Sequence, residues 1–217
     1  LQRYVAGAEA SAQNVFDFWD TSLLASVTQS RRSDMDTAIS LFEGDTYEVK
    51  WQNVLELNAA NTLTFGYDFT EEEAHTESFG TVIDAEHKTD AVFAEHQVEA
   101  LPNLFLSGGL RYNDHSVFGD ETTYTASAAY LVEQTRTRLK TSYSTGYRSP
   151  SLYELFAPAT SFGPIGNPNL DPETSDTWDV GIEQEFWAGK GVLGVTYFDT
   201  RVEDFIDFVT GTGYTQV

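Results

Sequence analysis

The feature that most constrains this chain is an alternation of apolar and polar side chains that continues through almost its whole length. In the stretch "LTFGYDFT", every second residue from Leu63 to Phe69 is apolar, and the residues between them are polar or glycine. Successive side chains of a β-strand point to opposite faces, so this pattern predicts strands with one apolar and one polar face. The same pattern recurs around residues 104–112, 138–144 and 177–186.

Read in this way, the sequence predicts ten strands. They cover residues 1–12, 20–33, 45–58, 61–74, 87–100, 103–116, 121–132, 136–147, 174–187 and 191–206. Strands of soluble proteins most often have about 5 or 6 residues, whereas a tilted strand that crosses a bilayer needs about 9 to 11. The predicted strands are therefore long enough to span a membrane.

The predicted connections alternate between short and long. "NAAN", "LPN", "EQT" and "AGKG" are tight, whereas the connections around residues 34–44, 75–86 and 148–173 are long and polar. Short turns at one end and long loops at the other are typical of outer-membrane barrels, whose long loops face outside the cell. We therefore predict an all-β fold, an antiparallel up-and-down transmembrane β-barrel. Aromatic residues near the predicted strand ends agree with it: Trp19, Tyr47, Tyr67, Tyr112, Tyr147, Trp178 and Trp187.

Composition excludes several other classes. The chain has 34 acidic and 12 basic residues, a formal net charge of −22, so it lacks the clustered basic residues that nucleic-acid binding requires. It contains no cysteine, which excludes disulfides and thiolate metal sites. No apolar run approaches the roughly 18 residues of a membrane-spanning helix, which excludes a helical membrane protein.

Acidic residues gather in two of the predicted loops, and either group could bind Ca²⁺, which prefers several oxygen ligands on a flexible loop. The first group is Asp34, Asp36, Glu43 and Asp45, and the second is Glu71, Glu72, Glu73, Glu77, Asp84 and Glu86. A solvated acidic surface is the alternative. The four histidines show no metal-ligand spacing, although His75 and His87 flank one predicted loop and could meet across it.

No catalytic motif supports an enzyme. "GKGVLG", residues 189–194, matches a dinucleotide-binding fingerprint, but that fingerprint requires a following helix, and "VLGVTYFDT" has the alternation of a strand. We therefore interpret it as a glycine-rich hairpin turn. The sequence has neither a G-x-S-x-G nor an H-E-x-x-H motif, so we predict no enzymatic activity.

Three segments resemble TonB-dependent receptors of the outer membrane. They are "TGYRSPSLYELF", "GNPNLDPETSDTWDVGIEQEF" and "GVTYFDTRVEDFIDF". The combination includes a strand that ends in G-Y-R-x-P, a short L-x-E-L-F segment, an N-P-x-L-x-P-E turn and a strand that opens on S-x-x-W. Further upstream, the chain is similar to mid-barrel strands of the cobalamin and siderophore receptor group.

In this family a 22-stranded barrel surrounds an N-terminal plug. The resemblance therefore implies that residues 1–217 are a partial barrel domain of about ten strands, without the plug or the C-terminal strands. It also implies that an eleventh barrel strand begins at "GYTQV".

The resemblance further implies a location in the outer membrane of a Gram-negative bacterium, in contact with its lipid. Outer loops would capture a metal chelate such as cobalamin or a ferric siderophore, and TonB, acting through the plug, would energise its uptake. A passive porin-like channel and a soluble or cell-surface β-sheet binding protein are the alternatives.

The long connection from Thr145 to Trp178 contains five of the six prolines. Pro150 ends the preceding strand, "SLYELF" predicts a helical turn capped by Ser149 or Ser151, and later prolines stiffen the loop. By the resemblance, we expect this loop to contact the ligand through Tyr153, Phe156, Phe162, Asn167 and Asn169. The alternative is that its aromatic residues only pack the loop against the barrel rim.

Overall fold

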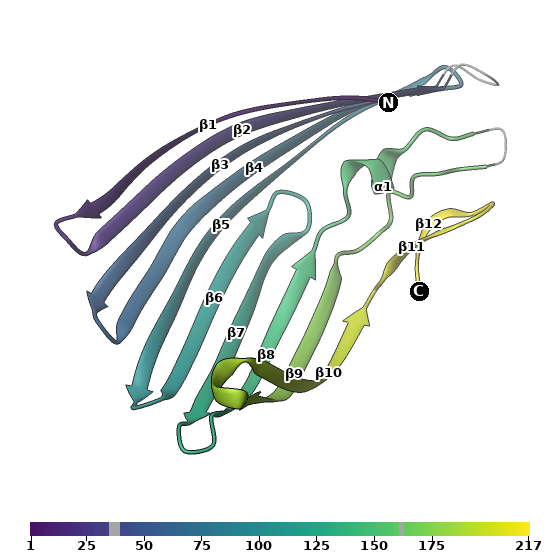
Figure 1. The fold of residues 1–217 in the computed structure, drawn as a ribbon. Coiled ribbons are helices and arrows are strands. Elements are labelled where there is room, and N and C mark those ends of the chain that lie inside the picture. The colour runs from purple at the N-terminus through teal and green to yellow at the C-terminus, as the bar shows by residue number, and fades with distance from the viewer. Residues whose placement is uncertain (35–39, 161–162) are drawn as a thin grey trace.

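A computed structural model describes residues 1–34, 40–160 and 163–217. Ten strands form one curved antiparallel sheet in chain order, so each pairs with its neighbours in the sequence (Figure 1). The strands are β1 (Gln2–Val15), β2 (Trp19–Asp34), β3 (Ser40–Asn58), β4 (Asn61–Ser78), β5 (Thr81–Leu101), β6 (Leu104–His115), β7 (Gly119–Val132), β8 (Thr137–Arg148), β9 (Glu173–Phe186) and β10 (Gly191–Glu203). This confirms the predicted up-and-down order and all ten strands. The sheet is open in this chain, with β1 and β10 at its edges.

The tight connections are confirmed, but one predicted long loop is wrong. β4 continues to Ser78 and β5 begins at Thr81, so the predicted loop at 75–86 is a hairpin whose turn is Phe79–Gly80. Both turn residues have positive φ, 50° and 81°, which suits a two-residue hairpin turn. The charged residues that suggested a loop instead pair across the strands, as Lys88 does with Glu71.

The predicted loop at 34–44 is also shorter than expected, because β3 begins at Ser40. Its remaining residues, 35–39 with Asp36 among them, lie outside the described residues. At the opposite end of the sheet, a single 3-10 turn, η1 (Trp187–Gly189), joins β9 to β10. This confirms a hairpin turn at the start of "GKGVLG", whose last four residues already belong to β10.

The two faces of the sheet differ in polarity. The register places Trp51, Tyr67, Val92 and Tyr112 side by side on the convex face, which exposes large apolar side chains on most strands. Toward the loop end, this apolar band ends in a row of aromatic residues: Tyr47, Tyr67, Tyr112, Tyr143 and Trp178. Beyond that row the strands carry charged side chains.

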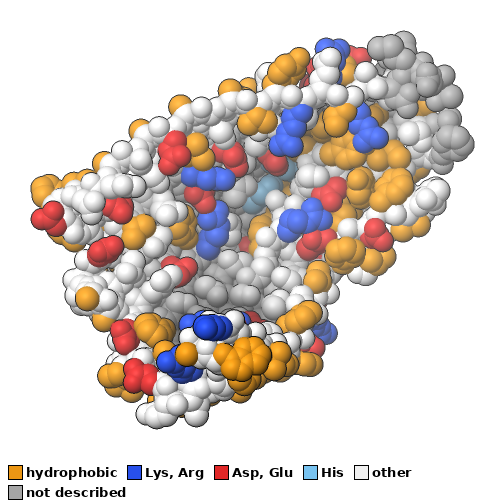
Figure 2. Space-filling model, in the orientation of Figure 1, with side chains coloured by type: hydrophobic (Ala, Val, Ile, Leu, Met, Phe, Trp, Pro, Cys, Tyr) orange, Lys and Arg blue, Asp and Glu red, His pale blue; other side chains and the backbone are white. Residues whose placement is uncertain are grey.

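The concave face is polar and carries charged side chains of both signs (Figure 2). It contains a hollow of about 420 Å³. Residues that line the hollow include Lys50, Gln52, Asp68, Phe93, Glu95, Arg111 and Thr123. An apolar convex face and a polar concave face are the arrangement of a barrel wall in a membrane.

Among the described residues, no helix combines the length and the apolar composition needed to cross a membrane.

The C-terminal segment corrects another prediction. β11 (Ile206–Val209) and β12 (Gly213–Gln216) form a separate two-stranded hairpin, so "GYTQV" is not the start of an eleventh barrel strand. The chain leaves the sheet after Glu203, at Asp204, whose φ is +56°. The hairpin then packs on the long loop through Ile206 and Tyr214.

Candidate functional site

The loop between β8 and β9, described at residues 149–160 and 163–172, folds back against the inner wall of the long strands (Figure 1). Its short helix α1 (Leu152–Phe156) buries Leu152 against Phe42 of β3 and Ala74 of β4. The tip of the β4–β5 hairpin also contacts the loop, because the Ser78 hydroxyl donates to the Ala159 carbonyl at 3.0 Å. The loop therefore covers part of the concave side of the sheet at this end of the strands.

A second apolar cluster joins the loop to the C-terminal hairpin. Leu155, Leu170 and Ile206 are buried together. Phe118, Phe156 and Tyr214 pack against them. Since these residues come from α1, the β6–β7 turn and the hairpin, the cluster fixes the loop from several sides.

Helix α1 begins as the sequence predicts, and Ser151 is the cap. Its hydroxyl accepts from the Glu154 main-chain N–H at 3.2 Å, and the Glu154 carboxylate accepts from the Ser151 N–H at 2.8 Å. This reciprocal capping box satisfies N–H groups that a five-residue helix would otherwise leave free.

An ionic network at the base of the loop connects three of the motifs. The Arg148 Nε donates to Glu173 at 2.6 Å, and its Nη1 donates to Glu154 at 2.9 Å. The other oxygen of Glu173 accepts from the Ile206 N–H at 2.6 Å. Arg148 ends "TGYR", Glu154 lies in "LYELF" and Glu173 ends "LDPE", so the segments that carry the family resemblance meet here.

The network lies on the loop side of the aromatic row. Its contacts lower the pKa values of both glutamates. Hydrogen bonds from Arg148 hold the pKa of Glu173 below its ordinary value, against the opposing effect of burial. Burial raises the pKa of Glu154, but the bonds from Arg148 and Ser151 outweigh it, so the net shift is downward. Both carboxylates are therefore held in the charged form, as the Arg148 ion pairs require.

Two of the predicted ligand residues, Asn167 and Asn169, have different surroundings. Asn167 holds the loop together, because its main-chain N–H donates to the Glu154 carbonyl at 2.8 Å and its side chain donates to the Tyr214 carbonyl at 3.1 Å. Its side-chain oxygen also accepts from the Asn169 N–H. The Asn169 side chain is exposed, which leaves it available to a ligand.

The predicted aromatic residues pack against the barrel. The Tyr153 hydroxyl accepts from Arg32 of β2 at 2.9 Å, and its ring meets Phe42 edge-on with centroids 4.9 Å apart. Phe156 is half-buried and contacts both clusters. Phe162 lies outside the described residues. These contacts support a packing role for Tyr153 and Phe156, and ligand contact by the loop stays a prediction.

Within the hollow, Arg111 is fixed by its neighbours. Its guanidinium donates to Asp68 at 2.6 Å and to Asn113 at 2.9 Å, and it lies 5.8 Å from the centre of the Phe93 ring. Lys50 pairs with Glu48 at 3.2 Å. Alternation showed that these residues share the polar face, but only the register of β3–β6 shows which of them touch.

The histidine pair that the sequence suggested does not form. His75 bonds to Asp84 on the convex face at 2.6 Å, whereas His87 points to the concave face. His87 instead packs against His115 of β6, with ring centroids 5.0 Å apart. Sequence reasoning missed this pair, because the two residues are 28 positions apart and share no motif.

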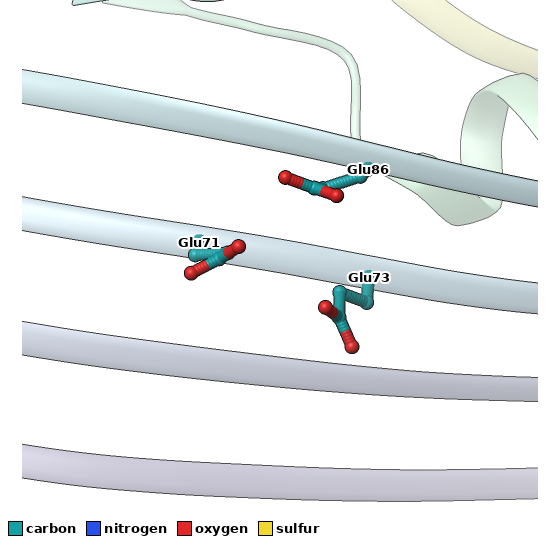
Figure 3. A group of neighbouring side chains, drawn as sticks. All are labelled: Glu71, Glu73 and Glu86. Carbon is teal, nitrogen blue, oxygen red and sulfur yellow. The ribbon is translucent and has the colours of Figure 1, made fainter.

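The second predicted acidic group contains three carboxylates whose oxygens lie within 4.8 Å of one another, from Glu71 and Glu73 of β4 and Glu86 of β5 (Figure 3). They lie on the face opposite the hollow. The Lys88 ammonium is 3.0 Å from Glu71 and 2.5 Å from Glu86, so a bound cation would compete with it. Calcium binding here stays a prediction.

Comparison with known proteins agrees with this geometry. The family model described as "TonB dependent receptor-like, beta-barrel" matches residues 2–217. The ferric enterobactin receptor of Pseudomonas aeruginosa is 28% identical over 184 residues, which cover 70% of this chain and 24% of that receptor. The vitamin B12 transporter BtuB of Vibrio cholerae is 25% identical over 185 residues, which cover 85% of this chain and 28% of that transporter.

Among solved structures, the siderophore receptor PirA of Pseudomonas aeruginosa matches with a TM-score of 0.82 and 22% identity, over 99% of this chain and 42% of that chain. The chain thus spans about a quarter of the length of these two sequence relatives. The family consists of receptors and transporters of the outer membrane rather than enzymes. This chain therefore belongs to the TonB-dependent receptor β-barrel family, as the match over residues 2–217, the ten antiparallel strands and the agreement in fold show.

Proposed function

We propose that this chain forms part of the wall of an outer-membrane receptor that takes up a metal chelate with energy relayed by TonB. The observation that carries the proposal is the family match over residues 2–217. The apolar convex face supports a lipid environment, and the loop packed against the concave side of the sheet supports a gated passage rather than an open pore.

For the cargo, we propose a ferric siderophore or cobalamin. The sequence relatives include a ferric enterobactin receptor and a vitamin B12 transporter. Both cargoes are large, polar and rich in hydrogen-bonding groups, which suits the exposed Asn169 amide and the charged side chains of the concave face. Asn169 is the described loop residue we assign most directly to cargo contact, because its side chain is exposed.

Binding of candidate cargoes to the full-length receptor tests this proposal. Purified receptor in detergent should bind either a ferric siderophore or cobalamin saturably, and the apo-siderophore or an unrelated metal chelate should not compete. If neither class binds, the proposed cargo is wrong.

A passive channel remains the function to exclude, because an inward-folded loop is also how a porin constricts its pore. The two functions differ in their energy requirement: a passive channel equilibrates solutes down a gradient, whereas a TonB-energised receptor accumulates its cargo. Family membership favours the second.

A further inference from the structure

His115 closes the turn between β6 and β7. Its Nδ1 lies 3.2 Å from the Val117 nitrogen and 3.3 Å from the Phe118 nitrogen, so it accepts both N–H groups. A ring nitrogen can accept only while its lone pair is free, which requires a neutral imidazole with its proton on Nε2. The conformation of this turn therefore depends on an uncharged His115.

The turn supports the folded loop through Phe118. Phe118 packs against the cluster of Leu155, Leu170 and Ile206. Its ring centroid lies 4.9 Å from that of His115 and 5.8 Å from that of His87. Figure 2 shows pale blue histidine deep on the concave face of the sheet. Phe118 therefore connects the two imidazoles to the second cluster.

Both imidazoles are in surroundings that disfavour a charge. His87 is 4% exposed and His115 is 3% exposed, and the His87 Nδ1 has no hydrogen-bond partner. Burial lowers the pKa of His87 to about 4, and the nearby His115 adds to the shift. Burial also lowers the pKa of His115, which Asp114 only partly opposes.

The charged groups on the surrounding elements do not pair with these rings. In the described part of the chain, none of them is hydrogen-bonded to either imidazole, and Lys88 and Arg148 are bound to carboxylates of their own. The groups are Glu72 on β4, Lys88 on β5, Asp114 on β6, Glu121 on β7, Arg148 on β8, Glu154 on α1 and Glu173 on β9.

We propose that protonation of His115 and His87 releases the described parts of the β8–β9 loop, residues 149–160 and 163–172, together with the C-terminal hairpin from the inner wall, so that the barrel mouth opens in acid. A proton on the His115 Nδ1 would face two N–H donors, so both hydrogen bonds of the turn are lost. It would also place a charge beneath an apolar cluster. Phe118 then no longer supports Leu155, Leu170 and Ile206.

The sign of the effect follows from the lowered pKa values. Because the docked state holds the histidine pKa values below the ordinary 6.5, docking is fully favoured above that pH and weakens as the pH falls toward about 4. The pKa values of Glu154 and Glu173 are lowered from 4.5, so the Arg148 network stays charged through the upper part of this window. Release of the loop in the upper part of the window between pH 6.5 and about pH 4 would therefore come from the histidines.

Distance measurements between spin labels test the proposal in the full-length receptor in lipid nanodiscs. This stretch has no cysteine of its own, so Thr81→Cys, at the start of β5, and Asn169→Cys on the loop supply two exposed labels. As the pH falls from about 7.5 to about 5, across the ordinary histidine pKa, a longer distance should grow at the expense of the docked one. An unchanged distribution would overturn the proposal.

Two variants distinguish loop release caused by protonation of His115 from a general effect of acid on the protein. His115→Asn keeps a side-chain acceptor without a titrating ring, and it should stay docked at about pH 5. His96→Asn, on the convex face, should respond as the wild type does.

Amide exchange at Val117 and Phe118, corrected for its intrinsic pH dependence, should accelerate by up to about tenfold per pH unit in the wild type and stay flat in His115→Asn. Equal release in His115→Asn and the wild type would also contradict the proposal.

Discussion

Arg148 and Glu173 are direct cross-strand partners, the last pair in the ladder between β8 and β9, and their side chains form an ion pair at 2.6 Å. The same arginine holds Glu154 of α1, and the same glutamate holds the main chain of the C-terminal hairpin. One pair at the end of two barrel strands thus fixes both elements that pack against the concave side of the sheet.

Replacement of Arg148 tests this role. The side chains of Glu154 and Glu173 are only 14% and 11% exposed, so Arg148→Ala leaves two poorly solvated carboxylates without a partner. The guanidinium itself is 45% exposed, which moderates the cost, and we expect loop docking to weaken by about 1–3 kcal/mol. Amide exchange at Leu155 and Asn167 should accelerate accordingly, because their N–H groups bond within the folded loop.

Arg136→Ala is the matched control. Arg136 pairs with Glu185 at 2.7 Å at the opposite end of the sheet, where the two side chains are 54% and 33% exposed. Its loss should cost no more than about 1 kcal/mol and should leave exchange in the loop unchanged. Similar loop exchange in both variants would show that Arg148 has no special role.

Gly166 is the second test of the folded loop. A Cβ at this position would lie 2.6 Å from the Ala157 nitrogen and 2.7 Å from the Leu155 carbonyl oxygen, and neither main-chain atom can move without distorting α1. We expect Gly166→Ala to weaken docking by about 1–3 kcal/mol. Gly108→Ala, whose Cβ would meet only the Thr125 oxygen at 4.0 Å, should be neutral. Amide exchange across residues 152–157 distinguishes the two, and equal effects would argue against a tightly packed loop.

Two substitutions separate ligand contact from loop packing. Asn169→Ala should weaken cargo binding several-fold, by about 1 kcal/mol, and should leave loop exchange unchanged, because the side chain is exposed. Tyr153→Phe removes the bond from Arg32 and should mainly loosen the loop, by about 0.5–1.5 kcal/mol. Binding isotherms paired with amide exchange measure both effects. A loss of affinity confined to Tyr153→Phe would reverse the assignment.

Substitutions by arginine on the two faces test which face of the sheet meets the membrane. Ile182 lies on the apolar face of β9, between Trp178 and Phe186, so Ile182→Arg should destabilise the barrel by about 2–4 kcal/mol. Thr196→Arg, on the polar face of the neighbouring β10, should be tolerated. Folding into lipid vesicles, followed by the mobility shift of the folded barrel on gels, compares them. Equal tolerance would contradict the assignment of the two faces.

Period-two alternation was sufficient to predict all ten strands and their order, because each strand has one apolar and one polar face over most of its length. It failed where both faces of the sheet are polar. At residues 71–77 and 84–88 charges occupy both faces, so the stretch reads as a loop, although cross-strand pairs such as Lys88 with Glu71 keep it in the sheet.

The folded loop was only partly predictable. Pro150 and the Ser151 capping box are local signals, and both appear in the sequence. The contacts of Arg148 with Glu173, of Arg32 with Tyr153 and of His115 with Phe118 depend on how strands are brought together around a curved sheet. The C-terminal hairpin was mistaken for a barrel strand because its alternation is the same, and the break at Asp204 has no clear sequence signal.

Cargo uptake with and without TonB tests the central claim most directly. Cells that produce the full-length receptor are given the radiolabelled ferric siderophore or cobalamin that it binds, in a strain that has TonB and in one that lacks it. The account predicts accumulation only when TonB is present and the inner membrane is energised, with binding to the cell surface retained in both strains. Equal uptake in the two strains would identify a passive channel and contradict the account.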